Sequence, residues 1–222
     1  MPIRKRPQLS RWIAAAALAW TCVALAAESD LSVNARLLLA ARNSDTAGID
    51  RALSAGASPD ARNRLGETAL VIALKKKDVA NARRMLDAGT DVNQAAVNGI
   101  TPLMAAAFAG DREIVEKLLA KGADPAPLDR LGKNAITYAA GEGHAAIVKA
   151  LLAKGVDANG VYKNDLTALM WAAGYGRTDA ARVLLEAGAR TDLKDNRGKT
   201  ATDIARDGGF SETAALLEGW KK

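Results

Sequence analysis

The strongest constraint on the fold is a period of 33 residues that holds over most of the chain. The segment Gly66-Glu67-Thr68-Ala69-Leu70 is followed at this spacing by related segments that begin at Gly99, Gly132, Asp165 and Gly198. A second register consists of glycines: Gly56, Gly89, Gly122, Gly155 and Gly188. A third consists of alanines: Ala40, Ala73, Ala106, Ala139, Ala172 and Ala205. A fixed period of this length predicts a stack of similar units rather than one closed core.

The opening of each period predicts the start of a short helix. Its third position always holds a side chain that can accept a backbone N–H and so cap a helix. These residues are Thr68, Thr101, Asn134, Thr167 and Thr200. Pro102 suits the first helical turn, Ala106 keeps the helix thin enough for close approach of a neighbour, and Gly110 ends it.

The second half of each period predicts another helix. In the period from residue 99, Ile114, Val115, Leu118 and Leu119 form a stripe on one helical face, which must be buried against a neighbour. Gly122 follows in the position of a left-handed cap. The polar residues after it predict a turn that projects between one pair of helices and the next.

Residues 99–124, GITPLMAAAFAGDREIVEKLLAKGAD, resemble the ankyrin-repeat family most closely, and the resemblance extends over about residues 33–222. It implies an all-α solenoid of about six stacked helix-turn-helix units with projecting β-turns. The more polar first and last units are expected to be caps. The expected organisation is a signal peptide (1–26), an N-terminal capping repeat (27–65), four repeats (66–98, 99–131, 132–164 and 165–197) and a C-terminal capping repeat (198–222).

The first segment of the chain predicts export. Arg4, Lys5, Arg6 and Arg11 precede an apolar stretch from Trp12 to Ala27, and Ala24-Leu25-Ala26 matches a cleavage site, so we expect cleavage after Ala26. An uncleaved membrane anchor is the alternative, although a span needs about 20 apolar residues. A lipoprotein anchored at Cys22 is a weaker alternative, because the preceding residues do not resemble a lipobox.

Removal of this segment changes the chemistry of the chain. It takes four of the 31 basic residues and no acidic residue, leaving 27 basic against 25 acidic residues. The remaining charge gives no reason to expect a nucleic-acid partner, and no membrane contact is expected after cleavage. The only cysteine, Cys22, is also removed, which suits an oxidising compartment. We therefore expect a periplasmic protein, acting as a monomer.

The sequence favours binding over catalysis. His144 is the only histidine, and it occupies a Gly-His pair that ankyrin repeats commonly have at the turn into the second helix. Without a second histidine or a mature cysteine, a metal cluster or a thiolate nucleophile is not expected. The recurring glycines act as helix stops rather than as a phosphate loop. We expect no catalytic residue, no cofactor and no metal.

The family resemblance implies that the turns and the exposed sides of the first helices form a concave surface that binds another protein. Its contact positions, carried over one by one, form a patch with an apolar centre and basic ends. The residues of this patch are Arg62, Arg64, Lys75, Val97, Ile100, Phe108, Leu128, Arg130, Leu131, Val161, Lys163, Leu166 and Tyr175. Exposed apolar side chains with a charged rim are typical of interfaces.

Several interpretations of this patch remain open in the sequence. Phe108, Ile100 and Leu166 could instead pack against neighbouring turns, and Trp171 is expected to pack between first helices. The leading functional hypothesis is a binding module for an exported protein of unknown identity. The runner-up is an inhibitor or immunity protein that blocks an exported toxin or enzyme. A third, an enzyme using acids on the concave surface, conflicts with the Lys and Arg residues expected there.

Overall fold

The computed structural model describes residues 31–220, so the predicted signal peptide lies outside the described residues. Within that range the chain forms six pairs of antiparallel helices and no extended strand. The first helices are α2 (Val33–Asn43), α4 (Ala69–Lys75), α6 (Pro102–Ala109), α8 (Ala135–Glu142), α10 (Ala168–Gly174) and α12 (Ala201–Asp207). The second helices are α3 (Thr46–Ser54), α5 (Val79–Asp87), α7 (Arg112–Ala120), α9 (Ala145–Ala153), α11 (Thr178–Glu186) and α13 (Ser211–Gly219). The predicted all-α repeat fold is confirmed.

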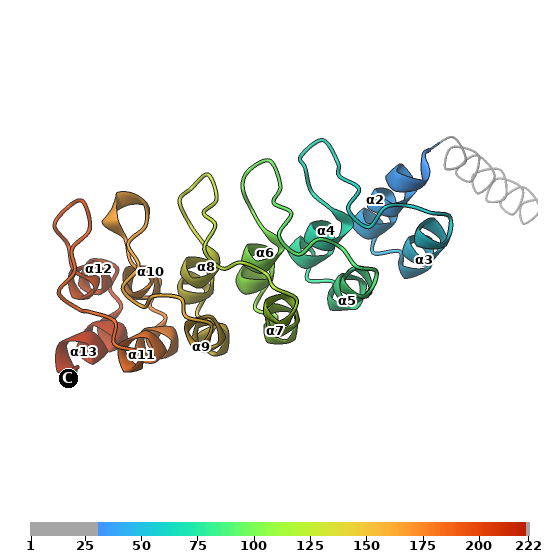
Figure 1. Ribbon diagram of the computed structural model, residues 1–222. Helices are drawn as coiled ribbons and strands as arrows, with labels where there is room; N and C mark the ends of the chain where they lie inside the picture. The colour runs from blue at the N-terminus through green and yellow to red at the C-terminus, as the bar shows by residue number, and fades with distance from the viewer. Residues whose placement is uncertain (1–30, 221–222) are drawn as a thin grey trace, which may run out of the picture.

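The first helices form one row and the second helices another, and long turns project from the side of the first row (Figure 1). We call these turns the first to fifth fingers, at residues 57–68, 90–101, 123–134, 156–167 and 189–200. The fourth finger contains a single 3₁₀ turn, η1 (Lys163–Asp165). Each first helix packs on the next first helix, so the core runs along the stack.

The start of each first helix confirms the predicted caps. The side chains of Thr68, Thr101, Asn134, Thr167 and Thr200 accept the backbone N–H three residues further on, at 3.2 to 3.3 Å. This hydrogen bond satisfies one of the donors that a helix start leaves without a partner, and it contributes about 1 kcal/mol. Because the cap recurs in every period from residue 66 onward, all five helices start at the same register position.

Small residues allow successive first helices to pack closely. The alanine register from Ala73 to Ala205 is fully buried between successive first helices, and Ala40 is nearly so. On the second helices, Ile114, Val115 and Leu118 are buried as the predicted stripe requires. A larger side chain at an alanine position would push neighbouring repeats apart, because such interiors are packed as densely as organic crystals.

The fingertips share one backbone conformation that favours glycine. Gly66, Gly99, Gly132 and Gly198 have φ between +71° and +83°, and Asp165 occupies the same register position with φ +59°. A side chain at positive φ crowds the following carbonyl oxygen, which costs about 1 to 2 kcal/mol. The fourth finger is therefore the one finger that carries this strain at its tip.

We predict that Asp165→Gly raises the free energy of unfolding by roughly 0.5 to 1 kcal/mol, since relief of the strain exceeds the added flexibility of the unfolded chain. Chemical denaturation of the two chains measures the difference. The matched control is Gly198→Asp, because a side chain there meets nothing within 4 Å and tests backbone strain alone. Gly198→Asp should destabilise by a similar amount; unchanged or lower stability of Asp165→Gly would contradict the prediction.

Candidate functional site

The exposed apolar surface lies on one side of the molecule. We call the surface formed by the fingers and by the exposed sides of α4, α6, α8, α10 and α12 the inner face. Within residues 31–220, eight large apolar side chains are exposed, and only Leu31 lies away from this face. The other seven are 48% to 61% exposed: Leu65, Val97, Phe108, Leu128, Leu131, Val161 and Tyr175. The second helices contribute none of these eight residues.

A row of four aromatic rings crosses the centre of the inner face. The edge of Phe108 on α6 meets Tyr138 on α8, with ring centroids 5.8 Å apart and planes at 87°. Further along, Trp171 on α10 stacks with Tyr175, with centroids 6.1 Å apart and planes at 10°. We call these four residues the aromatic row. Such rings give binding surfaces large contact areas at low conformational cost.

Lys133, in the third finger, joins the two halves of the aromatic row. Its ammonium lies 3.9 Å from the centroid of the Trp171 ring and 5.3 Å from that of the Tyr138 ring. A cation over the face of an aromatic ring is attracted by the negative charge of that face. Lys133 therefore holds the third finger against the first helices α8 and α10.

An apolar hollow of about 210 Å³ lies at the Phe108 end of the aromatic row. It is lined by Lys75, Ile100, Met104, Ala105, Phe108 and Tyr138. Its apolar floor and single cationic edge suit one bulky apolar side chain of a partner, because burial of such a side chain stabilises a complex by about 25 cal/mol per Å².

Gly141 on α8 leaves room for the rings of Trp171 and Tyr175, at the other end of the aromatic row. A side chain beginning at this glycine would meet the rings of Tyr175 at 3.6 Å and Trp171 at 3.8 Å. Because the glycine has no side chain, both rings approach the backbone of α8. Trp171 is half-buried there, so it packs between first helices as expected and also contributes its face to the aromatic row.

The phenol of Tyr138 is fixed by a hydrogen bond. Its hydroxyl donates to Asp129 Oδ2 at 2.5 Å. Burial of the ring, followed by this hydrogen bond and the negative charge of Asp129, raises the pKa of Tyr138 well above its ordinary value. The phenol is thus a neutral donor already engaged by its own chain, and what it offers a partner is its ring.

Three of the five fingers are pinned internally by one carboxylate or amide. Oδ1 of Asn63, Asp129 and Asp195 accepts two backbone N–H groups within the same finger. Ala96 and Tyr162 stand at the same register position in the second and fourth fingers, where no such acceptor is available. The first, third and fifth fingers are therefore held at their tips by a side chain of the same finger.

Backbone hydrogen bonds also connect neighbouring fingers. Val97 N donates to Leu65 O at 2.8 Å, Arg130 N to Asn98 O at 3.0 Å, and Asn196 N to Asn164 O at 3.0 Å. In addition, the Arg62 guanidinium donates to Gly66 O at 3.0 Å and to Ala95 O at 2.5 Å. These bonds connect the first three fingers to one another and the fourth finger to the fifth.

The basic residues of the predicted patch differ in whether their charged groups have partners within the chain. Arg62 is engaged by carbonyl oxygens, and Lys75 forms an ion pair with Glu67 at 2.7 Å. Burial opposes ionisation of Glu67, but hydrogen bonds from Lys75 and Asn63 outweigh it and hold its pKa below the ordinary value. Lys75 and Glu67 thus neutralise each other, and the Arg62 guanidinium is held by its own backbone.

Arg64, Arg130 and Lys163 lie at three fingertips, are exposed and form no ion pair among residues 31–220. Their charges are available to a partner, so this surface attracts acidic groups.

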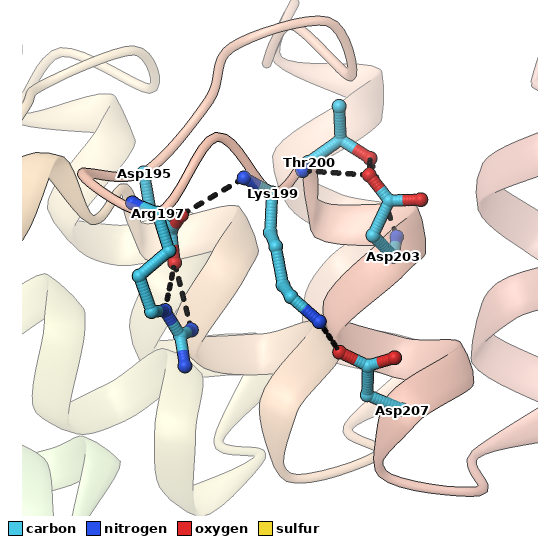
Figure 2. Close-up of polar contacts among 6 residues, drawn as sticks. All are labelled: Asp195, Arg197, Lys199, Thr200, Asp203 and Asp207. Carbon is cyan, nitrogen blue, oxygen red and sulfur yellow. Dashed lines mark hydrogen bonds and ion pairs between the residues drawn. The ribbon is translucent and has the colours of Figure 1, made fainter.

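At the other end of the inner face, the last repeat has its own closed network (Figure 2). Arg197 donates to Asp195 Oδ2 through Nε at 2.9 Å and Nη2 at 2.7 Å, and Lys199 pairs with Asp207. The Asp195 side chain is only 1% exposed. Burial alone would raise the pKa of Asp195, but backbone and guanidinium hydrogen bonds lower it below the ordinary value.

The structure brings only some of the predicted patch residues together. Lys75, Ile100 and Phe108 share the hollow, and Tyr175 belongs to the aromatic row. Ile100 and Leu166 are partly buried against the core. The remaining residues lie on the fingers, with Arg62 and Arg64 on the first, Val97 on the second, Leu128, Arg130 and Leu131 on the third, and Val161 and Lys163 on the fourth.

Tyr138, at the centre of the aromatic row, was missing from the predicted patch. Its position could have been found from the period, because Ala105, Tyr138 and Trp171 are 33 residues apart and therefore share one face of successive first helices. The contact positions implied by the family resemblance lie on the fingers and at the ends of the helices. They do not include position 138, which lies in the middle of a first helix.

His144 has a structural contact, as its position in the repeat predicts. Its Nε2 lies 3.3 Å from Phe108 O, and its ring lies over Gly110 of the preceding turn. Arg177, one period later, donates to Gly141 O in the same way at 3.0 Å. In these two repeats the side chain at this position links the helix pair to the preceding one.

Residues 31–220 lack two features that would suggest other roles. No group of three or more His, Cys, Asp or Glu side chains is arranged to hold a metal ion. In the same part of the chain, no helix has the length and hydropathy needed to cross a membrane.

The stacked helix pairs, projecting fingers and one-sided apolar surface define a helical repeat protein. The family model described as ankyrin repeats (3 copies) matches residues 37–129, 109–195 and 136–218, and the chain belongs to the ankyrin-repeat family. Ankyrin repeats generally mediate protein–protein interaction. A search of curated proteins finds no match to this chain.

The network around Asp195 predicts how the stability of the chain depends on pH. A lowered pKa means that the folded chain binds fewer protons than the unfolded chain in acid. The stabilisation is complete above the ordinary value of 3.8 and is lost as the pH falls through the lowered folded value. We predict that Asp195→Asn is less stable than the parent near neutral pH and loses less stability on acidification.

Denaturant titrations at a series of pH values measure this difference. An amide is compatible with the turn, since Asn63 accepts the same two N–H groups in the first finger. Asp207→Asn is the control at an exposed ion pair, where little pH-dependent stability is expected. Parallel curves for Asp195→Asn and the parent would contradict the assignment.

Proposed function

We propose that this chain is a periplasmic, monomeric binding module that holds an exported partner protein on its inner face. The observation that carries the proposal is the one-sided exposure of large apolar residues around the aromatic row. A surface that served only the fold would bury these side chains, because their exposure to water is unfavourable. The connected fingers support the proposal, since an ordered surface loses less conformational entropy on binding.

Export is supported by the first residues of the chain. The basic residues, the apolar stretch of about 16 residues and the Ala24-Leu25-Ala26 motif together fit a cleaved secretory signal. The absence of cysteine after residue 22 fits an oxidising compartment, where a free thiol would be liable to form unwanted disulfides.

A second candidate function is inhibition of an exported toxin or enzyme, as an immunity protein would do. It is favoured by the combination of an apolar hollow with the exposed cations Arg64, Arg130 and Lys163, which could close a cleft with acidic edges. Activity of the captured partner separates the two roles, because a partner that stays active in the complex is not inhibited.

We predict that Phe108→Ala combined with Tyr175→Ala abolishes capture of the partner. Both side chains are about half exposed, so their loss removes contact area while costing the fold only about 1 kcal/mol per aromatic pair. The experiment is site-specific photocrosslinking from the inner face in intact cells, followed by mass spectrometry of the crosslinked protein and thermal denaturation of each variant.

The matched control is Lys149→Ala with Arg182→Ala, which changes two exposed side chains on α9 and α11, in the row away from the fingers. These changes should leave the crosslink intact. If the aromatic double variant kept its crosslink, or if crosslinks formed equally from both rows of helices, the inner face would not be the binding surface.

Export predicts a defined mature chain. Cell fractionation in a bacterial host should place the protein in the periplasmic fraction, and its N-terminal residue should be Ala27 by mass spectrometry. Leu18→Arg interrupts the apolar stretch and should retain the full-length chain inside the cell. A full-length parent chain that stays in the cytoplasmic fraction would refute the periplasmic assignment without affecting the binding proposal.

A further inference from the structure

Lys133 carries a charge for which residues 31–220 supply no acidic partner. It is half-buried between the Tyr138 and Trp171 rings, and it forms no ion pair among residues 31–220. Neither Asp129, which accepts from Tyr138, nor Glu142 at the end of α8 pairs with it. A cation surrounded by rings is less exposed to water, which strengthens its attraction to an incoming anion.

The repeat provides an internal comparison for this site. Position 133 corresponds to Glu67 in the first full repeat and to Lys199 in the last, and both of those residues pair with a residue eight positions further on. The partners are Lys75 and Asp207, and Figure 2 shows the pair in the last repeat. In the repeat of Lys133 the corresponding residue is Gly141, which has no side chain. Three repeats have a charged residue at this register position: Glu67, Lys133 and Lys199. Among them, only Lys133 has no oppositely charged residue eight positions further on.

The surroundings of Lys133 indicate which chemical groups would accompany a carboxylate that binds to it. Tyr138 is shared between Lys133 and the apolar hollow next to Phe108. The fingertip cations Arg64, Arg130 and Lys163 lie on the same face. A carboxylate that approaches Lys133 therefore arrives beside a hollow suited to an apolar side chain, on a face where three exposed fingertip cations attract acidic groups and the exposed Asp165 partly opposes them.

We propose that the inner face binds a linear acidic segment of a protein. One Asp or Glu carboxylate of this segment pairs with Lys133, and a neighbouring bulky apolar side chain enters the hollow beside Phe108 and Tyr138. The partner's carboxylate neutralises Lys133 as Asp207 neutralises Lys199 in the last repeat. This inference rests on the proposed function and specifies the chemistry of the bound partner.

Selection from a displayed library of random dodecapeptides tests the inference directly. The immobilised chain should enrich peptides in which Asp or Glu stands next to Leu, Phe or Trp. Fluorescence anisotropy with an enriched peptide should show roughly two- to fivefold weaker binding for Lys133→Met, the loss expected for a partly exposed ion pair. Methionine keeps an apolar stem against the rings, so this comparison isolates the charge, and Lys133→Arg should restore most of the affinity.

Controls separate the charge from general effects. Lys149→Met on α9 removes a charge from the row away from the fingers and should leave affinity unchanged. Added salt should weaken binding to the parent more than binding to Lys133→Met, because screening acts on the charge pair. Thermal denaturation verifies that each variant is folded.

Three results would overturn the inference. They are a neutral or basic consensus, equal affinity of the parent and Lys133→Met for the enriched peptide, and no enrichment at all. In each case the photocrosslinking experiment still decides the proposed function, since a partner crosslinked to the inner face shows binding whatever its chemistry. Loss of that crosslink together with successful peptide enrichment would reveal a surface competent for acidic peptides but without a partner in the cell.

Discussion

Close packing between successive first helices is the contact on which the rest of this molecule depends. A single helix pair cannot bury its apolar stripe, so each pair is stable only against its neighbours. The buried alanines from Ala73 to Ala205 set the distance between neighbours. That distance in turn places the fingers side by side, where Val97 and Arg130 donate backbone hydrogen bonds to the preceding finger. The inner face is therefore a product of the stacking and has no separate scaffold.

The same regularity makes departures from the repeat meaningful. Where a register position changes from ion pair to apolar pair, as between Glu67 with Lys75 and Ile100 with Phe108, the fold is unaffected and only the surface changes. The last repeat returns to an ion pair between Lys199 and Asp207. The ion pair at this register position is thus kept near both ends of the stack, while the central repeats place aromatic rings there together with Lys133, which has no acidic partner among residues 31–220. The centre of the inner face is where a partner gains most from contact.

Most of the fold could be predicted from the sequence because the period repeats each local signal several times. The helix caps, the buried stripe of α7 and the left-handed Gly122 follow from residue type and spacing alone. The surface was harder to predict. Phe108 is exposed and Ile100 is partly buried, although both are apolar and stand at positions that carry an ion pair in the first full repeat. The period places Tyr138 on the same helix face as Trp171, but its edge contact with Phe108 depends on the distance between α6 and α8, which residue type and spacing do not give.

The fingertips differ in whether their order comes from within one repeat or from the next one. Asn63, Asp129 and Asp195 fix the first, third and fifth fingertips through an acceptor in the same finger, so contacts there lose little conformational freedom. The second and fourth fingers, with Ala96 and Tyr162 at that position, are instead held by backbone hydrogen bonds to neighbouring fingers. A change in one repeat therefore reaches the tip of its neighbour, and the shape of the inner face is set by pairs of repeats rather than by single ones.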